Sequence, residues 1–192
     1  MEPILKKIQR ELASQGYGAA SRGAKTWLKN KIRELKLDSS RLMREPANMK
    51  YRTFIGRMYF FFYNPKMKDS LPYYDIFPLV IPLEKYSDGF LGINLHYVRP
   101  NIRFKILENL SNTLNNSKLD ETTRMKVSYD YVKSISSINM IKPCLKRYLT
   151  QHVGSKFLHI DSSEWHLAAL LPFESFQKET KSKVFSESEK DF

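Results

Sequence analysis

Residues 57–63 read RMYFFFY, and this stretch decides the fold class. It is short and rich in aromatic side chains, which favours a β-strand over a helix. Asn64-Pro65, which follows it directly, is typical of a turn. We therefore expect a strand here, within a chain whose flanking segments show helical patterns.

Two further extended segments follow this strand. Residues 77–83 (FPLVIPL) contain two prolines, which exclude a helix interior and favour an edge or bulged strand. Residues 87–89 (SDG) predict a turn, and residues 90–97 (FLGINLHY) predict the returning strand. We expect a positive φ at Gly89 and a bulge near Gly92, both of which bend a sheet. The pattern predicts a small, strongly bent antiparallel sheet or an SH3-like barrel.

Helical spacing returns beyond Pro100. The pattern predicts helices over 102–114 and 120–135, a helix starting at Pro143 that carries Leu145, Tyr148 and Leu149, a strand over 156–160, and a helix over 164–171 capped by Ser162 or Ser163. From Gln177 onward the composition is polar and mixed in charge, which predicts an extended tail.

Two amphipathic helices are expected before the sheet, over 3–15 and 21–37, with Ser21 as the N-cap of the second. At 100° per residue, the basic residues of the second helix fall opposite its apolar face. Lys31 falls near the apolar face, where its stem can reach outward. We expect a basic helical arm over residues 1–50, an α+β body packed with helices over 51–176, and the tail over 177–192.

The charge is concentrated in the arm. Residues 1–57 hold 14 Lys/Arg against 5 Asp/Glu, whereas the remaining residues hold 18 against 15, and the whole chain carries +12. Charge gathered at one end predicts an anionic partner, such as a phosphate backbone, an anionic membrane or an acidic protein surface.

The basic stripe of the second helix, with two arginines beyond it, is the candidate partner site. The predicted contact residues are Arg22, Lys25, Lys29, Arg33, Lys36, Arg41 and Arg44. We expect these residues to dock on phosphates or on an acidic subunit without contacting the bases. The plainer alternative is that they form a solvated helix face. A membrane-surface helix is disfavoured because the apolar face is needed for packing.

The aromatic run over 59–63, together with Tyr73 and Tyr74, has two interpretations. It is either a base-stacking platform for single strands or part of the core, and aromatic residues in a strand more often belong to the core.

No pattern indicates chemistry. Cys144 is the single cysteine, which excludes an intrachain disulfide and a cysteine-based zinc site, and its apolar neighbours indicate a buried thiol. His159, Asp161 and His166 lie close in sequence without a metal-ligand spacing. Phosphate-loop, dinucleotide and nucleophile-elbow motifs are absent. We expect no enzyme, no metal and no cofactor.

Other features of the sequence are equally plain. We assign Asp69, Asp75 and Asp88 to turns, where aspartate makes local hydrogen bonds. No apolar run approaches ~20 residues and the N-terminus is charged throughout, so neither a membrane span nor a signal peptide is expected.

Two segments carry a resemblance: residues 55–98, IGRMYFFFYNPKMKDSLPYYDIFPLVIPLEKYSDGFLGINLHYV, and residues 141–176, IKPCLKRYLTQHVGSKFLHIDSSEWHLAALLPFESF. They resemble structural proteins of large contractile-tailed, T4-like bacteriophages over roughly residues 52–176. These segments have no assigned chemistry, so no functional residue can be transferred. The resemblance implies a component of the virion, made in the host cytoplasm, with other virion structural proteins as partners.

Two functions follow as predictions. The leading one is a non-enzymatic structural component of a tailed-phage virion, in the baseplate, tail hub or neck, whose arm docks on an acidic subunit or on DNA. The alternative is a nucleic-acid-binding protein such as a DNA-end-protecting protein. Salt separates them, because phosphate contacts weaken steeply with ionic strength, whereas a protein interface with an apolar core persists.

Overall fold

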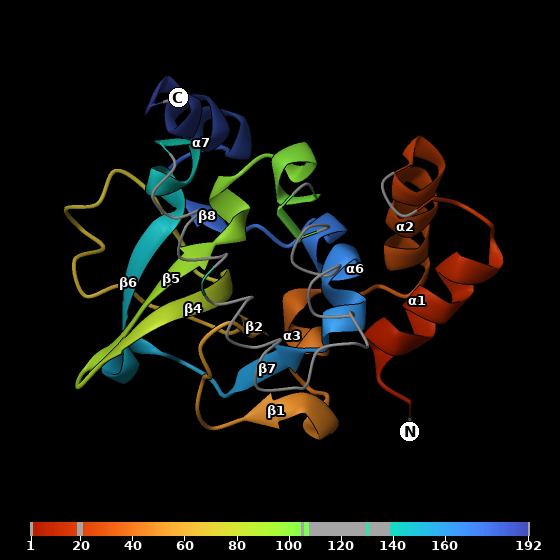
Figure 1. The fold of residues 1–192 in the computed structure, drawn as a ribbon, viewed down its shortest axis with the longest axis horizontal. Helices are drawn as coiled ribbons and strands as arrows, with labels where there is room; N and C mark the ends of the chain where they lie inside the picture. Colours follow the sequence, from red (N-terminus) through yellow and green to blue (C-terminus); the bar gives the residue numbers. More distant parts are fainter. Residues whose placement is uncertain (1, 19–20, 105, 108–129, 131–138, 192) are drawn as a thin grey trace.

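A six-stranded antiparallel sheet forms the centre of the protein (Figure 1). The computed structural model describes residues 2–18, 21–104, 106–107, 130 and 139–191. The strands, in spatial order, are β1 (Met49–Lys50), β7 (Phe157–Ile160), β2 (Met58–Phe60), β4 (Leu79–Tyr86), β5 (Gly89–Asn94) and β6 (Leu145–Leu149). A second sheet pairs β3 (Tyr74–Asp75) with β8 (Phe176–Gln177). Within the described residues β1 and β6 do not pair, so the sheet is open. The expected α+β class is confirmed.

Strand β2 lies in the middle of the sheet because its residues are apolar on both faces. It pairs with β4 on one side and β7 on the other, and all of its residues are buried. Met58 and Phe60 belong to the larger apolar cluster, whereas Tyr59 belongs to a smaller, aromatic cluster. The alternation of a strand thus divides this aromatic run between two layers of core. Regular pairing is shorter than expected and ends at Phe60.

The β4–β5 hairpin contains the expected bulge, on the strand opposite the glycine. The pairing register shifts between Pro82 and Glu84 of β4, which face Gly92 and Leu91 of β5. Strand β5 ends earlier than expected, at Asn94. The Asn94 side chain there accepts a hydrogen bond from the His96 backbone N–H at 3.0 Å, and the 3₁₀ helix η2 (Leu95–Tyr97) begins.

The expected positive φ at Gly89 is wrong, because the positive-φ glycines of the described chain are Gly16 and Gly56. Glycine is required at position 89 for a different reason. A Cβ there would lie 1.9 Å from the carbonyl oxygen of Tyr148 on β6. The absence of a side chain is what lets β5 and β6 approach each other.

The N-terminal helices are α1 (Ile4–Ser14), α2 (Arg22–Glu34) and the short α3 (Ser39–Leu42). Figure 1 shows α1 and α2 side by side at one end of the molecule. Helix α1 also packs against α6 (Trp165–Leu170). The apolar faces of α1 and α2 join the larger core cluster through Leu5, Ile8, Leu12, Ala24, Leu28 and Ile32.

Two segments toward the C-terminus differ from expectation. The helix expected to start at Pro143 is wrong: Pro143 lies inside the 3₁₀ helix η3 (Asn139–Cys144), and the residues after Cys144 form β6 along the edge of β5. The extended tail over 177–192 is also wrong, because Thr180 caps α7 (Lys181–Ser188) and Val184 is fully buried. Val184 is the one apolar residue of α7 that is buried, and a single buried apolar residue produces no helical periodicity in the sequence.

The segment between these two follows the prediction from the sequence closely. The expected strand over 156–160 is confirmed as β7. The helix expected over 164–171 begins with the 3₁₀ helix η5 (Ser162–Glu164) and continues as α6. Its cap is Asp161 rather than one of the expected serines. The remaining 3₁₀ helices are η1 (Pro46–Asn48), η4 (Thr150–His152) and η6 (Glu189–Asp191).

Residues 100–104 are helical, as expected. Most of the helices expected over 102–114 and 120–135 lies outside the described residues. None of the helices described has the length and hydrophobicity needed to cross a bilayer.

Candidate nucleic-acid interface

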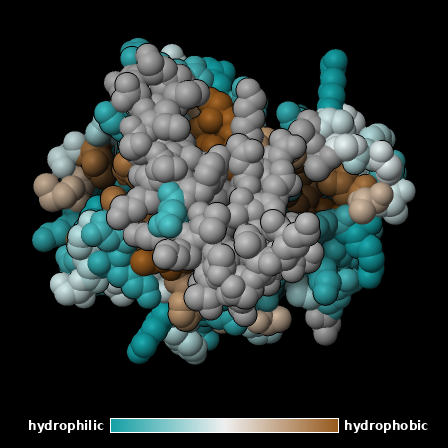
Figure 2. Space-filling model, viewed as in Figure 1, coloured by the Kyte–Doolittle hydropathy of each residue, from teal (hydrophilic) through white to brown (hydrophobic). Residues whose placement is uncertain are grey.

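Helix α2 presents its basic residues outward because its apolar residues are committed to the core. Ser21 caps the helix as predicted, accepting a hydrogen bond from the Ala24 N–H at 3.1 Å. Ala24, Leu28 and Ile32 are buried on the inner face. In Figure 2 hydrophilic residues cover much of the end of the molecule that α1 and α2 form.

All the predicted contact residues are exposed: Arg22, Lys25, Lys29, Arg33, Lys36, Arg41 and Arg44. Within the described part of the chain, none of them forms an ion pair with a carboxylate. Arg41 alone has a second role, since its guanidinium donates to the Leu35 carbonyl at the end of α2. We call this set the α2 stripe.

Lys31 departs from the stripe, as its angular position predicts. Its ammonium pairs with Glu11 of α1 at 2.9 Å and with Glu34 at 3.1 Å. Its hydrogen bond to Glu11 raises the pKa of Lys31 and lowers that of Glu11. Lys31 therefore ties α2 to α1 and leaves the other cations of the helix to the solvent.

A second basic surface lies on the loop between β1 and β2, and sequence reasoning missed it. Residues 50–57 read KYRTFIGR, and Tyr51 and Phe54 are 79% and 50% exposed. The Lys156 ammonium lies 4.4 Å from the centre of the Tyr51 ring. Arg57 and Lys85 lie 5.2 and 5.3 Å from the centre of the Phe54 ring.

This surface, which we call the aromatic loop, consists of Tyr51 and Phe54 with the cations Lys50, Arg52, Arg57, Lys85 and Lys156. The signal that could have found it is the interleaving of basic and aromatic residues in KYRTFIGR. None of its cations pairs with a carboxylate in the described chain. Figure 1 shows β1, where the loop begins, on a different side of the molecule from α2.

Hydrogen bonds tie the aromatic loop to the sheet beneath it. The Gly56 N–H donates to the Pro82 carbonyl of β4 at 2.9 Å, with Gly56 at φ 75°. The Phe54 N–H donates to the Tyr59 hydroxyl of β2 at 3.0 Å, and Thr53 is buried. The two exposed rings are thus carried by an anchored backbone, which lowers the conformational entropy lost when a partner binds.

The positive charge of this surface reaches a neighbouring histidine. Burial lowers the pKa of His159 on β7, and the charges of Arg57 and Lys50 lower it further. Asp161 opposes this shift, so the environment of His159 combines both signs of charge, with Arg57 and Lys50 on the side of the aromatic loop.

The aromatic run predicted either as a stacking platform or as core belongs largely to the core. Tyr59, Phe60 and Phe61 are completely buried, and Tyr63 is 8% exposed. Tyr63, Tyr73 and Tyr74 line a cavity of about 360 Å³ beside Lys66 and Lys146. This volume suits a small ligand rather than a duplex, whose major groove alone is about 12 Å wide.

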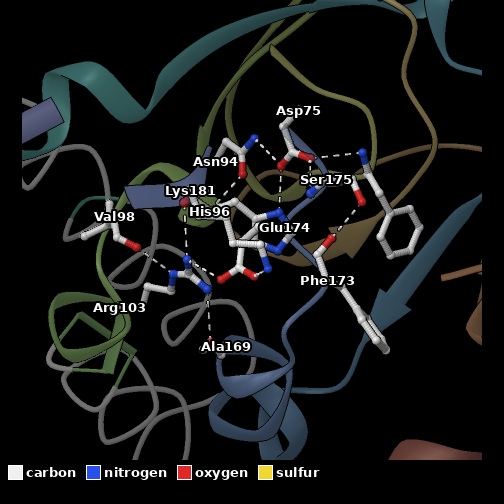
Figure 3. A network of polar contacts seen from close by, with 11 residues as sticks. Asp75, Asn94, His96, Val98, Arg103, Ala169, Phe173, Glu174, Ser175 and Lys181 are labelled. Carbon is white, nitrogen blue, oxygen red and sulfur yellow. Dashed lines mark hydrogen bonds and ion pairs between the residues drawn. The ribbon is translucent and has the colours of Figure 1, made fainter. Parts of the chain in front are cut away.

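A buried polar network adjoins this cavity, which two of its members, Asp75 and Asn94, help to line. Figure 3 shows the network. Asp75, which was expected in a turn, is instead in β3 and buried. Its carboxylate contacts His96 Nδ1 at 2.6 Å and accepts hydrogen bonds from the Asn94 amide, the Phe77 N–H and the Ser175 N–H. His96 is fully buried, so its ring is shielded from the solvent.

The same network fastens the C-terminal segment to the body (Figure 3). Arg103 is fully buried and donates to the carbonyls of Val98, Ala169 and His96. It also pairs with Glu174 at 2.7 Å, and Glu174 pairs in turn with Lys181 of α7 at 2.7 Å. These contacts assign the network a structural role.

The remaining candidate residues are placed separately. Cys144 is buried as predicted, and burial raises the pKa of its thiol to about 12. Asp161 caps η5, and His166 stacks on Phe104 with ring centres 4.7 Å apart. In the part of the chain that the structure describes, no cluster of three His, Cys, Asp or Glu side chains could hold a metal ion.

The fold and these surfaces define a small, basic α+β protein whose outward-facing cations are free to meet a polyanion. Comparison with family models matches residues 3–190 to the family described as Phage T4 terminal DNA protecting protein, and the chain belongs to that family. Comparison with curated proteins and with solved structures gave no match. The expected origin in a T4-like phage is therefore confirmed.

Proposed function

We infer that this protein binds the ends of duplex phage DNA and shields them from degradation. The observation that carries this proposal is the family to which nearly the whole chain belongs, whose description names terminal DNA and protection. The alternative prediction from the sequence thereby becomes the main one. A structural place in the baseplate, tail hub or neck remains the competing prediction.

The surfaces supply the chemistry that DNA binding requires. Unpaired lysines and arginines on the α2 stripe and the aromatic loop can replace the counterions condensed on phosphates, which is the main sequence-independent source of affinity for DNA. We propose that the α2 stripe contacts phosphates along the duplex. Protection then follows from occupancy, because a bound end is closed to an exonuclease, and no catalytic group is needed.

The test compares the protein with a charge-reversed variant of the stripe, Lys25→Glu, Lys29→Glu and Arg33→Glu. At 4 Å in water each attraction is worth about 1 kcal/mol, so we expect affinity for duplex DNA to fall on the order of 100-fold. The slope of log affinity against log salt should flatten by up to about 3. Protection of linear DNA from an exonuclease should fall in parallel.

A matched variant, Lys66→Glu, Lys68→Glu and Lys142→Glu, makes the same charge change at exposed lysines outside both surfaces. It should lose less affinity than the stripe variant. Equal losses of affinity in the two variants would mean that DNA binding depends on the total charge and not on the α2 stripe. If the unaltered protein leaves linear DNA unprotected at low salt yet enters phage particles, the structural-component function replaces this proposal.

A further inference from the structure

We propose that the aromatic loop recognises the DNA end itself, with Tyr51 and Phe54 stacking on the exposed face of the terminal base pair. This inference rests on the proposed function and names the surface that distinguishes an end from the rest of a duplex. Phosphate contacts cannot make that distinction, because phosphates are spaced alike along the whole molecule.

The chemistry of a DNA end matches this surface. Inside a duplex each base pair is stacked on both faces, so an aromatic side chain finds no free base face there. At the terminus one flat aromatic face is exposed to water and is rimmed by phosphates. An end-recognising surface therefore needs exposed aromatic rings surrounded by cations.

Tyr51 and Phe54 have this arrangement. Most large aromatic side chains are buried, and solitary exposed ones need no explanation. Here two exposed rings lie three residues apart on an anchored loop, and each already has a cation against its face or edge. The rings can exchange these cations for a base pair, and the released ammonium and guanidinium groups can then reach the phosphates.

The composition of the aromatic loop also favours DNA over a protein partner. Its cations, Lys50, Arg52, Arg57, Lys85 and Lys156, have no carboxylate partners among the described residues, and three of them are lysines, a residue type that is depleted in protein interfaces.

The decisive experiment uses two DNA probes with the full-length protein. One is a blunt duplex with open ends, and the other is the same duplex closed by a hairpin loop at each end. We expect the protein to bind the open duplex more tightly. The double variant Tyr51→Ala, Phe54→Ala should lose most of this difference, about tenfold or more, because stacking of a base on an aromatic ring is worth about 1–3 kcal/mol.

Three controls make the result specific. Tyr51→Trp with Phe54→Trp should keep the preference for open ends, because the stacking surface remains. Met67→Ala removes an exposed apolar side chain elsewhere and should leave the preference for open ends unchanged. A fluorescent 2-aminopurine at the terminal position should be quenched by the unaltered protein and by the tryptophan variant, but not by the alanine variant.

The outcomes separate this inference from the proposed function. If the unaltered protein prefers open ends and the alanine variant prefers them equally, the aromatic loop is not the end-recognising surface, while DNA-end binding stands. If the alanine variant loses affinity only for single strands, stacking acts on unpaired bases and the inference is wrong. If the unaltered protein does not distinguish open from closed DNA, both proposals fail.

Discussion

At the scale of single residues, two positions in the interior of this protein have unusual environments. Arg103 is among the largest fully buried side chains of the described residues, and its guanidinium pairs with Glu174. At Gly89 the backbone of β6 lies so close that an added Cβ would be 1.9 Å from the Tyr148 carbonyl oxygen. The amino-acid composition does not single out either position, and we predict that each contributes to the free energy of unfolding.

The buried pair of Arg103 and Glu174 predicts a specific dependence on pH. Burial alone would raise the pKa of Glu174, but the Arg103 guanidinium and neighbouring charges lower it from 4.5 to about 2. A lowered pKa means that the carboxylate stabilises the fold above the unfolded value and that this contribution is lost as the pH falls toward 2. The free energy of unfolding should therefore fall by about 3 kcal/mol between pH 5 and pH 2 on account of Glu174.

The variant Glu174→Gln tests this value in urea unfolding at several pH values. It should lose about 3–5 kcal/mol at pH 7, because Arg103 is left buried without its partner, and its stability should depend less on pH below about 4.5. Glu179→Gln is the matched control, since Glu179 pairs with Lys183 at the surface and such pairs contribute little. An unchanged acid limb in Glu174→Gln would contradict the assignment.

Gly89→Ala should destabilise the protein by about 3 kcal/mol, at the upper end of the usual cost of overpacking. The added Cβ would meet the backbone of β6, which cannot move without breaking strand pairing. Gly154→Ala is the matched control, because its Cβ would lie 3.7 Å from the nearest atoms of Phe62. Thermal unfolding of both variants measures the difference, and equal shifts in Tm would refute the close-contact explanation.

At the scale of elements, α2 has a buried face that contributes to stability and an outer face that we propose binds DNA. Its buried face supplies Leu28, which is 1% exposed, and its outer face supplies the cations of the stripe. An arrangement of this kind allows each function to be altered alone. The β1–β2 connection divides its residues similarly, since Thr53 is buried and its aromatic neighbours are exposed.

Leu28→Ala should lower the free energy of unfolding by about 2–5 kcal/mol through the cavity it leaves, while the folded fraction still binds DNA. The stripe variant Lys25→Glu, Lys29→Glu, Arg33→Glu should show the reverse, with a nearly unchanged Tm and weakened binding. Calorimetry and DNA titration on both proteins supply the comparison. A stripe variant that unfolds would mean that its cations stabilise the helix rather than bind a partner.

At the scale of the whole molecule, the sheet and the N-terminal helices share one apolar cluster but differ in how they are held. Strands β2, β4 and β5 are paired on both sides, whereas α2 packs on α1, and α1 packs in turn on η5 and α6. Short helices are marginal by themselves and depend on such packing. We therefore propose that residues 1–50 behave as an arm that opens more readily than the body over 51–176.

Hydrogen exchange on the isolated protein tests this division. Backbone amides of β2, β4 and β5 should be the slowest to exchange, and those of α1 and α2 should exchange faster by sub-global opening. Addition of duplex DNA should slow exchange in α2 and in the aromatic loop if both contact DNA. If amides of the arm and of the central strands are equally protected from exchange, the two unfold as one cooperative unit and the division is wrong.

The sequence by itself determined those features of the protein that depend on neighbours along the chain. The aromatic run at 57–63 predicted the central strand, Ser21 and the helical spacing predicted α2, and angular position alone singled out Lys31. The outward cations of the stripe followed from the same spacing. Periodicity reports which face of an element is buried, and it needs no knowledge of what lies on that face.

Only the tertiary structure decided the features that depend on contacts between distant segments. Residues 145–149 form a strand because β5 offers an open edge, and Asp75 is buried because His96 and Ser175 reach its carboxylate. Among many aromatic residues, tertiary packing also decided that Tyr59 and Phe61 enter the core while Tyr51 and Phe54 stay outside. Burial is set by what the rest of the chain brings to a position, and a linear pattern does not contain that information.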